Sequence, residues 1–301
     1  MLDKADSQPH IQALKDFMAN SGLRSLCALK HFFRTVRTYT EIDPEPKAGP
    51  SLFKVFRIRH SNRFGELSLV SAVSLGQICS QSRLSLTELS FENCVSLDSD
   101  VVHALAQCRA LHTLNLSYSV VVDDATIATI TRNCGALRCL ILQGLPRITA
   151  RTVDFVGGTK VTKLDLSLCA NILSSRSALF PLLKLSLTHL LLNGLDIQDS
   201  DLEIVAQVRT LQLLSLANCS NLSDRGLVHI SRGLLNLEAL NLEMSAARPC
   251  LFSESVVFHM LKLYLVKMRR LGCPAAVHSD RIKELMAARN TDFSCAKVVV
   301  Q

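Results

Sequence analysis

Apolar residues recur in one fixed frame between residues 86 and 242 of this chain. The frame consists of an apolar residue, a second one three positions later and a third two positions after that. It occurs seven times, and its first members are Leu86, Leu111, Leu137, Val161, Leu187, Leu211 and Leu237. Self-similarity at a spacing of 24 to 26 residues predicts a solenoid, in which neighbouring repeats share one continuous core.

Each unit reads as a short strand followed by a helix. Alternate strand residues point to opposite faces, so frame positions four and six face the core and position five faces outward. In the second unit, Ile127 and Ile130 have helical spacing and follow Asp123 and Asp124, which suit a helix start. The pattern predicts an α/β leucine-rich repeat solenoid of horseshoe shape, with parallel strands on the concave face and helices on the convex face.

Three regions follow from this pattern. We expect residues 1–50 to form a helical N-terminal cap and a proline-containing linker, and residues 51–250 to form the leucine-rich repeat array. A weaker frame at Phe64, Leu67 and Leu69 adds a unit within the array. Residues 251–301 are expected to be a C-terminal helical cap that can end in a closing strand.

The start of the C-terminal cap admits two interpretations. Ser253 can cap a helix whose apolar face continues to Met268. Alternatively, Met260, Leu263 and Leu265 fit the frame of an eighth strand. We prefer the helix, followed by a second helix over residues 280–289 and a strand near Phe293, Ala296 and Val298.

Charge and cysteine content limit the partners and the cellular compartment that we expect for the protein. The chain has a formal charge of +7, concentrated in the flanks at residues 24–63 and 254–289. A basic flank can meet an anionic partner, but without interleaved aromatic residues a solvated surface is favoured, and we expect no nucleic-acid partner. The eleven cysteines show no paired framework, and the sequence has no secretory signal. It also lacks an apolar stretch long enough to span a bilayer. We therefore expect a cytoplasmic or nuclear protein with no membrane contact.

Several repeats carry residues typical of a known subclass. The strands of repeats one, four and six run into Cys94, Cys169 and Cys219, and residues 123–127 and 223–227 read Asp-Asp-Ala-Thr-Ile and Ser-Asp-Arg-Gly-Leu. These features resemble the cysteine-containing leucine-rich repeats of F-box/LRR proteins. The resemblance implies that the repeats hold a substrate while an F-box grips a Skp-type adaptor on a cullin ubiquitin ligase.

The chain departs from that family at its N-terminus. It has no Leu-Pro followed by an acidic, aliphatic helix, and residues 23–33 are only similar to the later helices of an F-box. These residues form either a capping helix pair, which we favour, or a degenerate F-box. The resemblance to F-box/LRR proteins therefore covers the repeats alone, and the chain has no recognisable F-box.

The sequence contains no catalytic constellation. The cysteines lack Cys-x-x-Cys spacing and are expected to be packed thiols, except Cys139, which we expect at an outward strand position as a surface thiol. The segment 157–160 (Gly-Gly-Thr-Lys) lacks phosphate-loop spacing and predicts a turn. The histidines have no metal-ligand spacing, so we expect no cofactor, no metal and no enzymatic activity.

A binding surface remains as the candidate site. Outward positions on the middle strands would place five apolar side chains on the concave sheet: Tyr118, Ile141, Leu168, Leu191 and Leu213. Because adjacent strands lie about 4.8 Å apart, these side chains could form one patch with a polar rim. The alternatives are that Ile141 and Leu191 are scattered singletons or that the C-terminal tail covers them.

The sequence therefore predicts a non-enzymatic scaffold that binds a protein partner on the concave face. The resemblance makes it a substrate-recognition subunit or regulator of an SCF-type ubiquitin ligase, with a Skp-type adaptor and a cullin as further partners. The alternative is a structural subunit of a ribonucleoprotein or cytoskeletal assembly, docked through the basic flanks.

Overall fold

The computed structural model describes residues 55–59, 79, 83–84, 86–92, 97–175, 177–244, 251–274, 277 and 279–289. These residues belong to two compact units. The first unit comprises the chain up to Val122 together with Thr129–Leu137, and the second comprises Asp123–Ala128 and the chain from Arg138 onward. The N-terminal cap expected over residues 1–50 and the closing strand near Phe293 lie outside the described residues.

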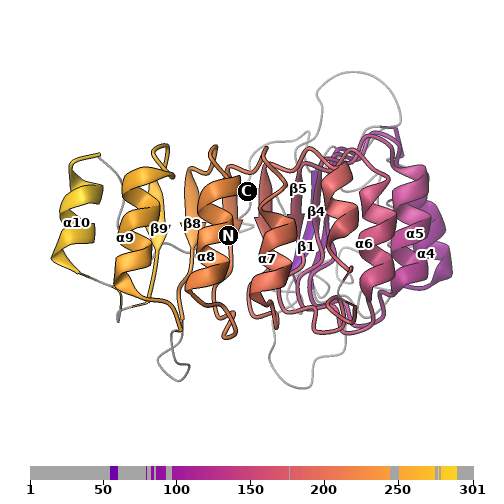
Figure 1. Ribbon diagram of the computed structural model, residues 1–301. Coiled ribbons are helices and arrows are strands. Elements are labelled where there is room, and N and C mark those ends of the chain that lie inside the picture. The colour runs from indigo at the N-terminus through magenta and orange to yellow at the C-terminus, as the bar shows by residue number, and fades with distance from the viewer. Residues whose placement is uncertain are drawn as a thin grey trace, which may run out of the picture. The chain divides into compact units, whose positions relative to one another are not determined.

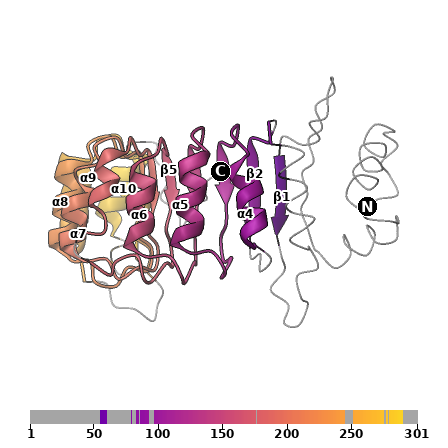
Figure 2. The same cartoon turned by 90° about the vertical axis from the view of Figure 1, so that its right-hand side faces the viewer.

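The first unit contains parallel strands that pair in chain order (Figure 2). Its elements are β1 (Val55–Arg59), β2 (Glu88–Glu92), α4 (Ser99–Ala106) and β3 (Thr113–Asn115), and α5 (Asp124–Asn133) contributes residues to both units. Helix α4 begins where Asp98 Oδ1 accepts a hydrogen bond from the Val101 amide at 2.9 Å. The strand that pairs with β2 on the side away from β3 is β1. The weaker frame at Phe64, Leu67 and Leu69 lies outside the described residues.

The second unit repeats the strand and helix arrangement along most of its length (Figure 1). Its elements are β4 (Cys139–Ile141), α6 (Ala150–Gly157), β5 (Lys163–Asp165), η1 (Phe180–Lys184), β6 (His189–Leu191), α7 (Asp199–Val205), β7 (Leu213–Ser215), α8 (Asp224–Gly233), β8 (Ala239–Asn241), α9 (Glu254–Leu263), β9 (Arg270–Gly272) and α10 (Asp280–Ala287). Each strand from β4 to β9 pairs with the next in parallel. The helices lie on one side of these strands.

The predicted frame is confirmed by burial. All residues at frame positions one, four and six are at most 1% exposed. In the second unit the position-four side chains form a register of identical residues across neighbouring strands: Leu140, Leu164, Leu190, Leu214, Leu240 and Leu271. Parallel strands, alternating helices and a core shared between neighbours make the fold an α/β leucine-rich repeat solenoid.

The preferred helix after residue 250 is confirmed at its start, because α9 begins after Ser253, whose side chain accepts a hydrogen bond from the Val256 amide. The helix ends at Leu263, short of Met268, and the alternative strand is wrong, since residues 260–265 form no strand. The strand is β9, and Leu271 pairs in register with Leu240. Met268, Leu271 and Cys273 are 1%, 1% and 3% exposed and form an eighth frame. The sequence frame failed here because a longer loop after β8 shifts the spacing and a cysteine takes position six. The array continues past residue 250, and the helix expected over 280–289 is α10.

The fourth repeat replaces its α-helix with the 3₁₀ helix η1, which begins at Phe180-Pro181. Gly157, the last residue of α6, lies against Pro181: a Cβ there would come within 2.8 Å of the Pro181 Cβ and carbonyl oxygen. The glycine therefore permits the close approach of the two elements. The turn predicted at 157–160 is confirmed, since α6 ends at Gly157.

A ladder of carboxylates links the helix starts of the second unit. Asp124 accepts hydrogen bonds from the Thr149 amide and hydroxyl at 2.8 and 2.7 Å. Asp199 accepts from the Ser223 amide and hydroxyl at 3.0 and 2.5 Å. At each of these two starts the acid satisfies the N-cap residue of the next helix, which confirms the helix-start role expected for Asp124. The first turn of α6 contains no acid, so the ladder is interrupted between α6 and α7.

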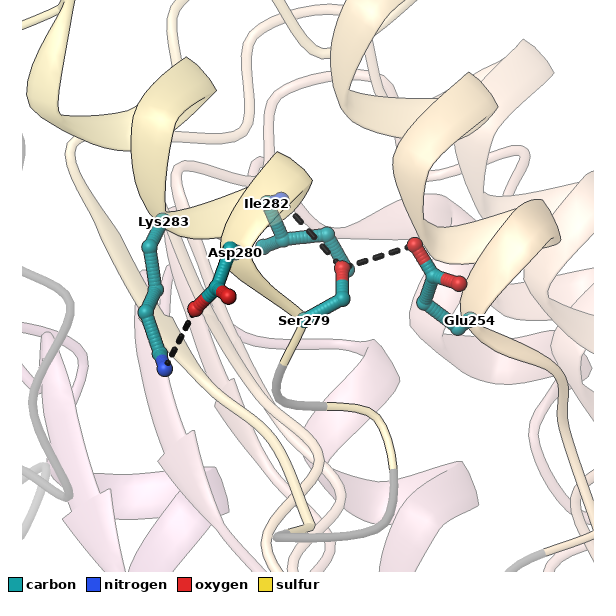
Figure 3. Close-up of polar contacts among 5 residues, drawn as sticks. All are labelled: Glu254, Ser279, Asp280, Ile282 and Lys283. Carbon is teal, nitrogen blue, oxygen red and sulfur yellow. Dashed lines mark hydrogen bonds and ion pairs between the residues drawn. The ribbon is translucent and has the colours of Figure 1, made fainter.

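The ladder continues to the last described helix. Asp224 accepts from the Ser253 amide and hydroxyl at 2.6 and 3.0 Å. Figure 3 shows the final step, in which the Ser279 hydroxyl donates to Glu254 Oε1 at 2.7 Å and accepts from the Ile282 amide at 3.4 Å. Each Ser or Thr therefore caps its own helix and fixes that helix to the preceding one.

Candidate protein-binding face

Outward strand residues of the second unit define the surface that we call the outer face. They occupy frame positions three and five of β4 to β8, on the side of the strands opposite the helices. The outer face consists of Cys139, Ile141, Lys163, Asp165, His189, Leu191, Leu213, Ser215, Ala239 and Asn241.

Polar residues of the outer face close the turns that follow the strands. Asp165 Oδ1 accepts a hydrogen bond from the Ser167 amide at 2.8 Å, and Asn241 Oδ1 accepts one from the Glu243 amide at 2.9 Å. Ser215 donates its hydroxyl to Asn193 Oδ1 at 2.6 Å. These side chains replace missing backbone partners, as Asx turns do, and their first role is structural.

The five apolar residues proposed for binding have different environments. Leu168 is 48% exposed, whereas Tyr118 and Ile141 are half-buried. Leu191 and Leu213, expected to be exposed, are only 3% and 8% exposed. They form a buried apolar cluster with Ala239, which the sequence reasoning did not include. The expectation of one exposed patch is therefore wrong for these two leucines. Tyr118 belongs to the first unit and the other four to the second.

Among the described residues, those with a positive φ all occupy frame position eight, where the backbone is left-handed. Tyr118, Leu168 and Asn218 have φ of 59°, 61° and 60°, and Gly144 and Gly194 have φ of 68°. A leucine in this conformation is strained by about 1–2 kcal/mol. Its side chain extends over the next repeat, where a Cβ on Gly194 would lie 2.5 Å from Leu168 Cδ2. The repeat thus holds a large apolar side chain, half exposed, at the edge of the outer face.

The cysteines are buried thiols in the described repeats. Cys169 donates to the Leu142 carbonyl at 2.9 Å and Cys219 to the Leu192 carbonyl at 3.2 Å, and each bond joins neighbouring repeats. Burial raises the pKa of Cys169 to about 11 and that of Cys134 to about 12. Cys94 lies outside the described residues. These thiols fill the turn and tie adjacent coils together.

Cys139 does not match the expectation of a surface thiol, because it is only 7% exposed. It stands on the outer face in register with Lys163. A short side chain beside a long one is shielded from solvent even at an outward position. Strand alternation predicted the direction of Cys139 correctly, whereas its accessibility depends on the side chains beside it.

Two titratable groups of the outer face have shifted pKa values. Burial raises the pKa of Asp165, although hydrogen bonds from Ser167 oppose the shift. Burial and the nearby charge of Lys163 lower the pKa of His189. Both shifts disfavour the charged form, which indicates that this surface is shielded from water.

The outer face combines apolar side chains with a few hydrogen-bonded polar groups. Within the described ranges, no three His, Cys, Asp or Glu side chains come together as a metal site would require. Searched over the same ranges, the helices include none that is long and apolar enough to cross a bilayer. Apolar side chains with a few fixed polar groups are what a protein-binding surface presents.

Comparisons with known proteins found similarity among solved structures. No family model matches the chain, and no curated protein matches it. Solved structures with similar folds include TLR13 in its complex with ssRNA13, with a TM-score of 0.48 and 18% identity over 74% of this chain, which spans 29% of the TLR13 chain.

This chain spans a larger share of two further solved structures. One comes from the complex of Rad7 and Elc1 in yeast, with a TM-score of 0.46 and 16% identity over 79% of this chain and 74% of the other. The other is the leucine-rich repeat-containing protein LegL7 from Legionella pneumophila, with a TM-score of 0.49 and 15% identity over 83% of this chain and 96% of the LegL7 chain. The assignment of the fold rests on the strand and helix order of this chain itself.

Proposed function

We propose that this protein is a non-catalytic scaffold that binds a protein partner through the outer face and its Leu168 edge. The observation that carries the proposal is Leu168, a leucine that stays 48% exposed in a strained left-handed conformation. Strain and exposure both disfavour leucine for stability alone. A role in contact with another molecule accounts for this choice of residue.

The neighbouring side chains extend the proposed site beyond Leu168. Ile141 is half-buried on β4 and accessible to a partner, whereas Leu191 and Leu213, at 3% and 8% exposure, form a buried apolar base on β6 and β7. An apolar centre surrounded by fixed polar groups, such as Asn241, is the usual composition of a protein interface. Tyr118 occupies the corresponding position eight in the first unit and is proposed for the same role there.

The more specific role we propose is that of a substrate-recognition subunit or regulator of an SCF-type ubiquitin ligase. It is supported by the resemblance of the repeats to cysteine-containing F-box/LRR proteins, including Cys169 and Cys219. Gly226 belongs to the Ser-Asp-Arg-Gly-Leu segment that carries this resemblance. The packing requires a glycine there, because a Cβ would collide with Asp199 Oδ1 and come within 2.8 Å of Leu202 Cδ1. Buried free thiols agree with a reducing compartment such as cytoplasm or nucleus.

A second candidate is a structural subunit docked through the basic C-terminal segment. It is favoured by four exposed cations, Lys262, Lys267, Arg269 and Arg270, and by Val266, which is 61% exposed in the same segment. Positive charge with exposed apolar groups suits an acidic partner. The N-terminal basic flank at 24–63 lies almost entirely outside the described residues.

Affinity purification separates the two candidates. The tagged chain should recover a Skp-type adaptor and a cullin if it serves a ligase, and Leu168→Glu should retain that adaptor while losing the substrate protein. Lys267→Glu with Arg269→Glu is the matched charge variant on the basic segment. Loss of all partners in the basic variant, with none lost in Leu168→Glu, would reject the outer face in favour of the structural subunit.

A further inference from the structure

Large apolar side chains are exposed where the last two described coils turn from helix to strand. Leu235 lies in the turn between α8 and β8 and is 52% exposed, and Val266 lies in the turn between α9 and β9 and is 61% exposed. Leu263 and Tyr264, at the end of α9, are 59% and 37% exposed. Packing of the repeats does not account for these residues, because much of their apolar surface remains in water.

Leu235 and Val266 occupy the same position of neighbouring coils. Ala239 pairs with Arg270, so the residues four positions before them, Leu235 and Val266, correspond to each other. Helices α8 and α9, which precede the two turns, lie side by side (Figure 1). In the other described coils of the second unit the corresponding residue is polar or buried: Thr159, Leu185 and Arg209. Two adjacent turns therefore present exposed apolar side chains that the other coils of this unit lack.

Positive charge surrounds these apolar side chains in the sequence. Residues 232–238 and 262–270 contain five Lys or Arg residues and one acid, Glu238. We call this surface the turn edge, and it consists of Leu235, Lys262, Leu263, Val266, Lys267 and Arg269. Lys and Arg near the end of a helix also stabilise its dipole, which accounts for Lys262 in the last turn of α9. Lys267 and Arg269 lie beyond that helix, so this explanation does not extend to them.

The cations of the turn edge are held in place by neighbouring groups. Lys267 Nζ donates a hydrogen bond to Asn236 Oδ1 at 2.7 Å. Lys262 Nζ lies 5.7 Å from the centroid of the Phe258 ring. Arg269 Nε lies 3.6 Å from Glu238 Oε2, on the coil before it. Side chains that are already ordered lose less freedom when they bind a ligand, so these cations are prepared to meet carboxylates.

The charge and the apolar groups together favour one class of ligand. A second copy of this chain is disfavoured, because a symmetric contact would bring the same cations against each other. Phosphates of a nucleic acid would meet the cations but would leave Leu235, Leu263 and Val266 without a role. An anionic peptide with apolar side chains satisfies both parts of the surface.

We propose that the turn edge binds an acidic, amphipathic peptide segment of a partner protein. Apolar side chains at i and i+4 of a helix lie about 5–6 Å apart, which matches the spacing of neighbouring coils of about 4.8 Å. Two such side chains contact Leu235 and Val266, and carboxylates beside them pair with Lys262, Lys267 and Arg269. The fixed positions of these cations suit the fixed carboxylates of a peptide better than the mobile headgroups of an anionic bilayer.

This inference deepens the second candidate function and rests on it in taking the basic segment as a docking site. It adds Leu235 from the preceding coil and names the chemistry of the ligand. The turn edge precedes β8 and β9, whereas Leu168 follows β5, so the two sites lie at opposite ends of parallel strands. A scaffold of this kind holds two different partners at the same time.

Fluorescence anisotropy with the full chain and a synthetic peptide tests the proposal. The probe is a fluorescein-labelled, alanine-rich helix of about 18 residues with leucines at i and i+4 and glutamates beside them. We expect Lys267→Glu with Arg269→Glu to weaken its binding about tenfold or more, and Leu235→Ser with Val266→Ser to do the same. Arg151→Glu with Lys160→Glu, two exposed cations of the fourth coil region, is the matched charge control and should bind as wild type does.

Polyglutamate of the same length separates recognition from charge alone. It should bind at least about tenfold more weakly than the probe. Equal binding of the two peptides, or no effect of Leu235→Ser with Val266→Ser, would overturn the proposal. Binding of phosphatidylserine vesicles or single-stranded RNA by a chain that does not bind the probe would overturn it too.

A crosslinking measurement uses the wild-type chain, so misfolding of a variant does not affect it. A photoreactive benzoylphenylalanine in place of one leucine of the probe should join it to residues 232–238 or 262–270, as mapped by mass spectrometry. Crosslinks confined to the outer face would contradict the proposal.

Failure of this inference and failure of the proposed functions give different results. Leu168→Glu should bind the probe as wild type does, because the outer face is a separate site. If the probe does not bind but Lys267→Glu with Arg269→Glu loses its cellular partners, the acidic peptide is rejected and the docking site is retained. If the probe binds and that variant keeps every cellular partner, the inference is supported and the structural subunit is rejected.

Discussion

The carboxylate ladder predicts a large effect from one small substitution. Asp199→Ala removes the acceptor of two hydrogen bonds, from the Ser223 amide at 3.0 Å and from its hydroxyl at 2.5 Å. Hydrogen bonds to a charged group contribute about 1.5–3 kcal/mol each, and partial solvent access of this pair reduces the sum. Loss of the acid from the first turn of α7 adds about 0.3–1 kcal/mol. We expect the free energy of unfolding to fall by about 2–4 kcal/mol.

A double-mutant cycle with urea denaturation measures this directly. Ser223→Ala removes the hydroxyl but keeps the amide, so the cycle with Asp199→Ala should give a coupling energy of about 1–2 kcal/mol. Asp154→Ala, an exposed acid on α6, is the matched control and should change stability by less than about 0.5 kcal/mol. Equal effects of Asp199→Ala and Asp154→Ala would refute the ladder as a source of stability.

Three further predictions concern the core, the turns and the thiols. Leu164→Asp places an unpaired charge in the shared core and should abolish folding, which circular dichroism would show; a native-like melting curve would contradict the frame. Asp165→Asn keeps the Oδ1 acceptor and removes a charge whose pKa is raised by burial. A raised acid pKa means that stability is lost as pH rises from the unfolded to the folded pKa, so this variant should melt higher than wild type at pH 7 and equally at pH 3. Cys134 and Cys169, with pKa values near 12 and 11, should resist alkylation at pH 8 in the native chain and react after denaturation; rapid native labelling would contradict their burial.

The sequence predicted the repeats well because leucines at frame positions make their contacts within one coil and its neighbours. It failed where spacing changed, since the eighth frame at Met268, Leu271 and Cys273 follows a longer loop and includes a cysteine. A periodic frame reports local packing and does not register an insertion that leaves the packing intact.

The candidate site was harder to predict from the sequence for a physical reason. Alternation in a strand gives the direction of Leu191 and Leu213 but not what lies above them. Their 3% and 8% exposure reflects tertiary packing, which no local pattern encodes. Leu168 was placed on the binding surface by its frame position, whereas its left-handed backbone could have been inferred from Gly144 and Gly194 at the same position of other repeats.

The most direct test of protein recognition by the outer face is a comparison of captured partners between two variants of the full chain. Ile141→Glu with Leu168→Glu changes the accessible edge of that face, and Lys267→Glu with Arg269→Glu changes the basic segment while leaving the face intact. Quantitative mass spectrometry of affinity-purified material should show about tenfold or greater loss of a specific partner from the first variant, with wild-type recovery from the second. Wild-type recovery from the first variant, at an unchanged melting temperature, would contradict the assignment of the binding site.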